Sequence, residues 1–211
     1  MLQSPAARDV VVDDAVTIVS ELATNAFVHG VPGRPPDGPG PELVMYVRRA
    51  RTEIVTQVFD SGPWKGRLPR TCVRSDLATE SGRGLQLVDA LTAEHGGSWG
   101  VHRSRSRLAT VPEVAYFVQP VPEGGRSGQV DLDSGGRALG AALRARGLGP
   151  LHGCEGWDMA VLSVRAAITV WVRSSTISLI TPLTGTVRYP LVDVADVVEG
   201  IVRCNEDLDA C

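Results

Sequence analysis

Two glycines precede an apolar run in the pattern S-G-R-G-L at residues 81–85. Glycines leave backbone N–H groups open to an anion, and the start of a helix adds partial positive charge at the same place. The chemistry that Gly82, Arg83 and Gly84 predict is therefore anion binding at a helix N-terminus. A flexible loop that leads into a helix would produce the same short pattern.

A second candidate, Asp60, follows a predicted strand and precedes Ser61, Gly62 and Pro63. A carboxylate at a strand end can accept a hydrogen bond from an exocyclic amine, and a glycine lets a flat ring approach the backbone closely. An ordinary Asp-Ser-Gly-Pro turn is the alternative.

Three polar side chains, Glu21, Asn25 and His29, follow one another at intervals of four residues. Residues at this spacing project from one stripe of a helix, here beside its apolar face. A solvated helix edge explains the stripe equally well. His29 precedes Gly30 at the predicted helix end, where it can interact with the helix dipole.

The elements that position these residues follow from the hydrophobic period. Helical spacing predicts helices over residues 10–29 and from Gly82 to the glycines at 96–97. β-rich runs predict strands at 43–48, 53–59, 99–103 and 114–118, of which the first two form a hairpin. The Pro- and Gly-rich residues 31–41 predict a loop, and residues 61–81 predict a long surface segment of the kind that forms lids.

A second pattern begins after residues 121–136, which are rich in Pro, Gly, Ser and acidic side chains and predict a linker. We expect a helix at 138–146, three or four strands between 159 and 189, and a last helix at 193–205. Alternating Ile168, Val170 and Val172 give a strand one apolar face, which the last helix can cover. Residues 137–211 thus predict a small α+β domain, to which no role is assigned.

Composition excludes several classes of protein. The 211 residues are 43% hydrophobic with a net charge of −3, which predicts one or two small globular domains. We expect no membrane span, and the first residues do not resemble a signal peptide, so the expected location is the cytoplasm. Without a basic excess, no direct nucleic-acid partner is expected. The four cysteines lack metal-site spacing and are expected to be reduced thiols.

The order of these motifs resembles the Bergerat-type ATP-binding fold, which includes gyrase, histidine-kinase catalytic domains and anti-sigma-factor serine kinases. The stretches V-S-E-L-A-T-N-A-F-V-H-G, V-F-D-S-G-P and S-G-R-G-L-Q-L-V-D-A-L are most similar to small actinobacterial regulators of the anti-sigma-factor kinase type. The resemblance covers about residues 10–118. It implies an α+β fold, with residues 1–120 as a two-layer α/β sandwich of the histidine-kinase-like ATPase type.

The resemblance also implies roles for the candidate residues. Asn25 would ligate the Mg²⁺ that bridges the phosphates of ATP. Glu21 would act as general base on the hydroxyl of an acceptor protein or on water. Asp60 would bind the adenine amine, and Gly62 would let the ring approach. The triphosphate would be wrapped by Gly82, Arg83 and Gly84.

Two departures from the family pattern concern the ends of this domain. Family members usually begin with a strand and a helix ahead of the first motif helix, whereas here nine residues precede it. An edge strand is therefore expected to be missing from the sheet. The final strand usually follows a glycine-containing turn, and here residues 105–112 precede it instead.

Three functions remain open at this point. The first is a Mg-ATP-dependent serine/threonine kinase that phosphorylates a small protein antagonist and regulates a sigma factor, as a possible homodimer. The second is a non-catalytic nucleotide-dependent binding module. The third is an interaction protein with a degenerate pocket. Only the first requires Glu21 for turnover, so a substitution of Glu21 separates the first from the second.

Overall fold

A computed structural model of the chain describes residues 5–29, 41–60, 83–105, 113–120, 132–149, 151–155, 159–165 and 167–209. It divides into two compact units. One comprises Met1–Tyr46 and Thr52–Gly124, and the other comprises Val47–Arg51 and Gly125–Cys211. Both combine helices with an antiparallel sheet, which confirms the predicted α+β class. None of the helices in the described ranges is long and apolar enough to cross a membrane.

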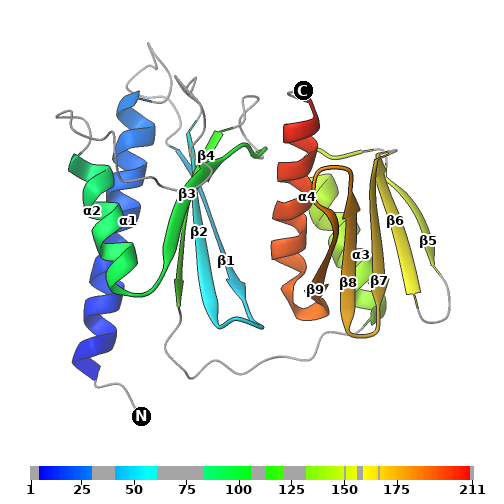
Figure 1. Ribbon diagram of the computed structural model, residues 1–211, viewed down its shortest axis with the longest axis horizontal. Coiled ribbons are helices and arrows are strands. Elements are labelled where there is room, and N and C mark those ends of the chain that lie inside the picture. The colour runs from blue at the N-terminus through cyan, green and yellow to red at the C-terminus, as the bar shows by residue number, and fades with distance from the viewer. Residues whose placement is uncertain are drawn as a thin grey trace. The chain divides into compact units, whose positions relative to one another are not determined.

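The N-terminal unit is a four-stranded sheet with two helices on one face (Figure 1). The strands lie in the order β1-β2-β4-β3, and β4 pairs antiparallel with both β2 and β3. The elements are α1 (Pro5–His29), β1 (Glu42–Arg48), β2 (Glu53–Asp60), α2 (Arg83–Glu94), β3 (Ser98–His102) and β4 (Glu113–Pro120).

The core of this unit forms where α1 and α2 meet the sheet. On α1, Ile18, Leu22 and Ala26 recur every four residues and are almost fully buried. They pack with Val58 of β2, Val88 of α2 and Phe117 of β4. This spacing gives α1 one face for the sheet.

Helix α2 ends just before Gly96 and Gly97, as the sequence predicted. Gly96 adopts φ +69°, a conformation that glycine reaches without a Cβ penalty. Its N–H donates to Ala93 O at 3.0 Å, and the N–H of Gly97 donates to Thr92 O at 2.9 Å. This pair of bonds is a Schellman motif, which satisfies the last carbonyls of a helix.

The C-terminal unit is a five-stranded antiparallel meander, β5-β6-β7-β8-β9, with two helices packed on it. The elements are α3 (Leu132–Ala145), β5 (His152–Glu155), β6 (Met159–Arg165), β7 (Ile168–Arg173), β8 (Thr176–Thr181), β9 (Gly185–Pro190), a 3-10 turn (Leu191–Asp193) and α4 (Val194–Asp209).

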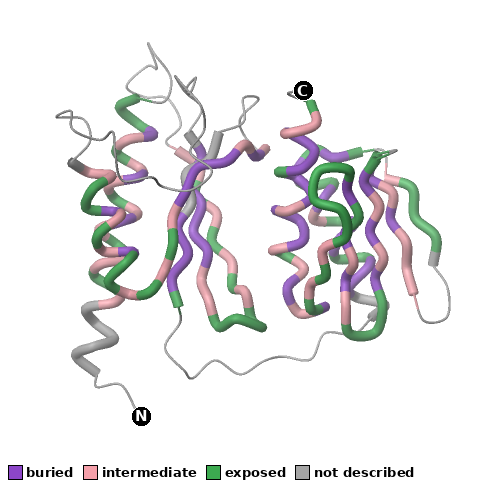
Figure 2. Tube along the Cα trace, in the orientation of Figure 1, coloured by how far each residue is buried: buried purple, intermediate pink, exposed green. Residues whose placement is uncertain are grey.

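Its core lies between one face of the middle strands and the two helices. Ile168, Val170 and Val172 of β7 are fully buried, in agreement with the alternation in the sequence. Val197 and Ile201 of α4 belong to the same cluster. Figure 2 shows that buried positions concentrate on β7, β8 and the inward sides of α3 and α4, while β9 is largely exposed.

Three differences between the elements and the prediction matter most. Helix α1 begins at Pro5 rather than at residue 10. Strand β5 was not predicted, because His-Gly-Cys-Glu contains no β-branched residue. Helix α3 begins at Leu132, so residues 132–136 are helical although they were assigned to the linker.

The early start of α3 has a packing reason. A Cβ at Gly135 would lie 2.8 Å from Leu191 Cδ1, and one at Gly136 would lie 3.3 Å from Ala160 Cβ. These glycines let the helix approach its neighbours closely, a use that composition alone does not distinguish from flexibility. The loop predicted before β1, the segment predicted at 61–81 and most of the predicted linker lie outside the described residues.

Candidate functional site

Two motifs that are sixty residues apart meet beside the first turn of α2. Glu21 and Asn25 lie four residues apart on α1, and α2 begins at Arg83. A Cβ built at Gly84 would overlap Glu21 Oε2 and would lie 3.8 Å from Asn25 Nδ2. Gly84 therefore touches both polar residues of the α1 stripe, and the structure brings these three predicted site residues together.

The absence of a side chain at residue 84 leaves room for the Glu21 carboxylate. The first turn of a helix carries unsatisfied N–H groups and partial positive charge. A carboxylate next to this turn is electrostatically favourable. Sequence reasoning assigned Gly84 to the triphosphate alone, because its contact with α1 depends on how the two helices pack.

Asn25 supplies an unusual polar group at the same place. Its Nδ2 is buried and has no hydrogen-bond partner among the described residues. A buried polar atom without a partner costs roughly 1–3 kcal/mol, so such atoms in native proteins generally receive a ligand or water. The amide can present either its nitrogen to an anion or its oxygen to a cation.

The other predicted site residues are placed in part. Asp60 is the last residue of β2 and lies opposite Glu113 of β4, which confirms that it ends a strand. Arg83 is the first residue of α2. Gly62 and Gly82 lie outside the described residues, so their expected roles stay predictions, as do the roles of the Asp60 and Arg83 side chains.

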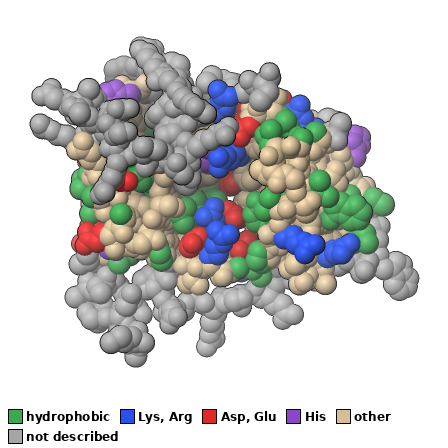
Figure 3. Space-filling view, in the orientation of Figure 1, with side chains coloured by type: hydrophobic (Ala, Val, Ile, Leu, Met, Phe, Trp, Pro, Cys, Tyr) green, Lys and Arg blue, Asp and Glu red, His purple; other side chains and the backbone are tan. Residues whose placement is uncertain are grey.

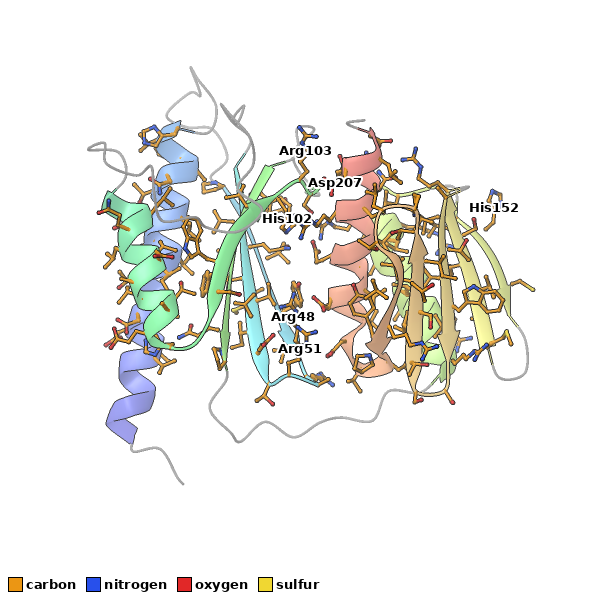
Figure 4. The ribbon with its side chains drawn as sticks, in the orientation of Figure 1. Arg48, Arg51, His102, Arg103, His152 and Asp207 are labelled. Atoms are coloured by element: carbon orange, nitrogen blue, oxygen red, sulfur yellow. The ribbon has the colours of Figure 1, made fainter. Side chains whose placement is uncertain are left out.

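Three of the four histidines have contacts or positions away from this site. His95 Nε2 lies 2.7 Å from Asp14 Oδ2, which links the end of α2 to α1. His102 Nδ1 lies 2.8 Å from Arg103 O. His152 is exposed on β5 and points outward from the sheet in Figure 4. His29 is the last residue of α1 and is exposed.

Blue and red side chains lie next to one another at several places on the face that Figure 3 shows. In Figure 3, the blue Arg side chains over the C-terminal strands occur in small groups among hydrophobic and neutral surface. Within the described part of the chain, no group of three His, Cys, Asp or Glu side chains could hold a metal ion.

Helices on one face of an antiparallel sheet, with Glu21 and Asn25 of the first helix against Gly84 at the start of the second, form a two-layer α/β sandwich. A family model described as a histidine kinase-like ATPase domain matches residues 2–108, which is half of the 211 residues. The chain therefore belongs to the histidine kinase-like ATPase family. A search of curated proteins found no match.

Proposed function

We propose that this protein is a Mg-ATP-dependent serine/threonine kinase of the anti-sigma-factor type, which phosphorylates a small protein antagonist and so regulates transcription. The observation that supports this proposal best is the meeting of Glu21, Asn25 and Gly84. A regulatory ATPase needs a carboxylate, a metal ligand and a phosphate-binding turn next to one another. Membership of the ATPase family supports the nucleotide part of the proposal.

The residues present fit Mg²⁺ and ATP. The amide nitrogen Nδ2 of Asn25 is buried without a hydrogen-bond partner among the described residues, and the oxygen of the same amide is the kind of ligand that Mg²⁺ prefers while it keeps several waters and shares phosphates. When bound, the ion would neutralise phosphate charge. In the proposal, Asn25 anchors the metal and Glu21 takes the proton of the acceptor hydroxyl.

The remaining residues would bind the nucleotide. Asp60 at the end of β2 would accept a hydrogen bond from the adenine amine, with Gly62 beside the ring. The turn Gly82, Arg83 and Gly84 would donate backbone N–H groups to the triphosphate. We keep the cytoplasm as the expected location, and a sigma factor or its antagonist as the expected partner.

Calorimetric titration with ATP, with and without Mg²⁺, tests the nucleotide site. Asp60→Asn should weaken ATP binding roughly ten- to a hundredfold, because a charge-assisted hydrogen bond contributes about 1.5–3 kcal/mol. Asp13→Asn is the matched control, since Asp13 is exposed on α1. Unchanged affinity in folded Asp60→Asn protein would show that the adenine binds elsewhere.

Glu21→Gln separates catalysis from binding. Nucleotide affinity should persist, while transfer of labelled phosphate to a candidate antagonist should fall by about 10²–10⁴-fold, the usual contribution of a general base. Glu94→Gln on the exposed end of α2 is the control. If the wild type binds ATP and transfers phosphate to no candidate, the protein is a nucleotide-dependent binding module.

We also propose that the C-terminal domain, assigned to residues 137–211 from the sequence, contributes a protein contact and no catalytic group. The buried apolar residues of its middle strands and helices form one core. Because an edge strand is expected to be missing from the N-terminal sheet, residues 1–120 produced alone should be poorly soluble or less stable. A folded, monomeric fragment with an unchanged thermal midpoint would show that the C-terminal domain is an independent appendage.

A further inference from the structure

The sheet of the C-terminal unit has one side that packs against α3 and α4 and one side that does not. Val170 and Val172 of β7 are buried in the same cluster as the apolar residues of both helices. Because side chains alternate along a strand, Trp171 between them points to the opposite side, where it is half-buried. We refer to the side of the sheet that carries Trp171 as the outer face.

The strand register identifies the other residues of the outer face. Trp171 pairs with Ser178 of β8, and Ser178 pairs with Arg188 of β9. Directly opposite residues project from the same face, so Trp171 and Arg188 share it, about 10 Å apart across two strand spacings. Arg173 follows Trp171 by two residues and lies on the same face, about 7 Å along the strand. The outer face thus places two guanidinium groups around one aromatic ring.

The positive charge of the outer face is not neutralised by the described residues. The four strands β6 to β9 contain three Arg and no Asp or Glu, whereas α4 contains five acidic residues. Arg165 pairs with Asp209 at 2.7 Å, but Arg173 and Arg188 are exposed and form no ion pair with any described residue. In Figure 3, hydrophobic and neutral surface surrounds the blue side chains over these strands. A complementary ligand is therefore negatively charged.

Apolar and hydroxyl side chains lie beside these charges. Ile180 follows Ser178 by two residues on β8, so it also lies on the outer face, where it is 39% exposed. Thr169 and Thr176 take further outward positions on β7 and β8. Hydroxyl groups donate and accept hydrogen bonds, so they suit the backbone of an extended chain. The ligand that fits this surface combines carboxylates with apolar side chains.

We propose that the outer face binds an acidic, extended segment of a partner protein, with carboxylates on Arg173 and Arg188 and an apolar side chain on Trp171. The argument is charge complementarity, because guanidinium groups pair with carboxylates in a fixed, two-bonded geometry. Aromatic residues and Arg are also the types enriched in protein interfaces. A single-stranded nucleic acid fits less well, because it needs cations along its whole backbone and several stacking rings. This inference rests on the protein contact proposed above for the C-terminal domain.

A nitrogen-15 NMR titration of the full chain with a synthetic peptide of Asp-Asp-Val-Val repeats tests the proposal. In an extended chain, this repeat places an acidic and an apolar side chain on one face, about 7 Å apart, which matches the spacing of Arg173 and Trp171. Peak shifts should be confined to β7, β8 and β9. The peptide should bind less tightly in about 0.5 M salt, since salt screens exposed charges.

Substitutions on the outer face should weaken this binding. Arg173→Glu and Arg188→Glu should each raise the Kd about fivefold or more, because each replaces an attraction with a repulsion. Arg144→Glu on the exposed surface of α3 is the matched control, since it changes the net charge equally and should leave the Kd unchanged. Circular dichroism checks folding. Arg173→Gln or Arg188→Gln, with an expected effect of about twofold, replaces a charge-reversed variant that fails to fold.

Three results would overturn the proposal. If the peptide does not bind, or shifts peaks of other elements, the outer face does not take an acidic segment. If an Asn-Asn-Val-Val peptide binds equally well, the arginines do not select the ligand. If a thymidine oligonucleotide of similar length binds more tightly, the ligand is a nucleic acid. None of these results changes the ATP titrations or the test on residues 1–120, so a failure here is distinct from a failure of the proposed function.

Discussion

The two units use their buried polar groups differently. In the C-terminal unit, the guanidinium of Arg146 donates from Nη1 and Nη2 to the two carboxylate oxygens of Glu199. The two side chains are only 8% and 9% exposed. In the N-terminal unit, Asn25 Nδ2 and Thr92 Oγ1 are buried and have no hydrogen-bond partner among the described residues. The first arrangement pairs two buried charges, whereas in the second only Asn25 lies beside Gly84, at the candidate site.

The apolar cores differ in the same direction. Among the described residues, sixteen buried side chains form the cluster of the C-terminal unit, and six form the cluster between the helices and sheet of the N-terminal unit. In an ATP-binding site, some polar groups must be free to form hydrogen bonds with the nucleotide or its metal ion rather than with one another. Among the described residues, the larger apolar cluster thus lies in the C-terminal unit, whereas the unpartnered amide nitrogen beside Gly84 lies in the N-terminal unit.

The largest expected effect is in the C-terminal core. Glu199→Ala removes the carboxylate that faces Arg146 and should lower the free energy of unfolding by about 3–5 kcal/mol, because the guanidinium charge stays buried. Urea denaturation followed by circular dichroism measures this loss. Asp209→Ala is the control: Asp209 pairs with Arg165 at 2.7 Å, but the side chains are 48% and 38% exposed. It should cost at most about 1 kcal/mol.

In the N-terminal unit, the steepest loss of stability should come from Gly97→Ala. The new Cβ would overlap the backbone oxygen of Val118 and would lie 3.1 Å from Thr92 Cγ2. Backbone cannot rotate away as a side chain can, so we expect a loss of about 1–3 kcal/mol. Gly96→Ala, in open space at φ +69°, should cost about 1 kcal/mol. Equal thermal midpoints for Gly97→Ala and the wild type would contradict this close approach.

Gly84→Ala should separate stability from binding. Its Cβ would meet only the flexible end of Glu21, and alanine is favoured over glycine in a helix by about 1 kcal/mol, so stability should change little. ATP affinity should fall roughly tenfold, about 1.4 kcal/mol, because the added methyl group also takes space beside Asn25, 3.8 Å from its Nδ2, where the Mg²⁺ of Mg-ATP is proposed to bind. Calorimetry and thermal unfolding on one sample measure both quantities.

Gly140→Ala on α3 is the counterpart of this variant in the other unit. A Cβ there would make ordinary contacts, 3.6 Å from Arg144 Nη1 and 3.7 Å from Leu162 Cδ2. It should stabilise the protein by about 0.5–1 kcal/mol and leave ATP affinity unchanged. If Gly84→Ala and Gly140→Ala bind ATP equally well, the contact at Gly84 does not serve the site.

The smallest effect should appear at alkaline pH. Burial raises the pKa of the Cys204 thiol above its ordinary value of 9.0, although a hydrogen bond with Thr181 opposes the rise. Burial also raises the pKa of Tyr189, with Asp196 acting in the same direction. Above about pH 9 the unfolded chain loses these protons before the folded chain does, so stability should fall as pH rises. Cys204→Ala should make the fall of the unfolding free energy between pH 9 and 10 shallower; an identical slope would refute the assignment.

Much of the molecule is predictable from its sequence because its signals are local. The helical spacing of apolar residues over 10–29 predicts α1, and Gly96 predicts the end of α2. The α+β class follows from these periods. The motif order around Asp60 and Gly84 indicates the ATPase family, which the match to residues 2–108 bears out.

Some local patterns are ambiguous because two structures share one composition. The glycines at 135 and 136 resemble a linker, yet they belong to a helix that packs closely. In β1, Leu43 and Met45 alternate with Val44 and Tyr46, so both faces are apolar. The period of a strand then identifies neither face as the buried one.

The sequence by itself determined the helices, most strands, the family and the candidates Glu21, Asn25 and Gly84. Only the tertiary structure decided that Gly84 lies against Glu21 and that Leu43 and Met45 of β1 are exposed. The hydrophobic period of a helix or strand depends on residues that are close together in the sequence. Contacts across sixty residues depend on strand order and helix packing, which no single segment encodes.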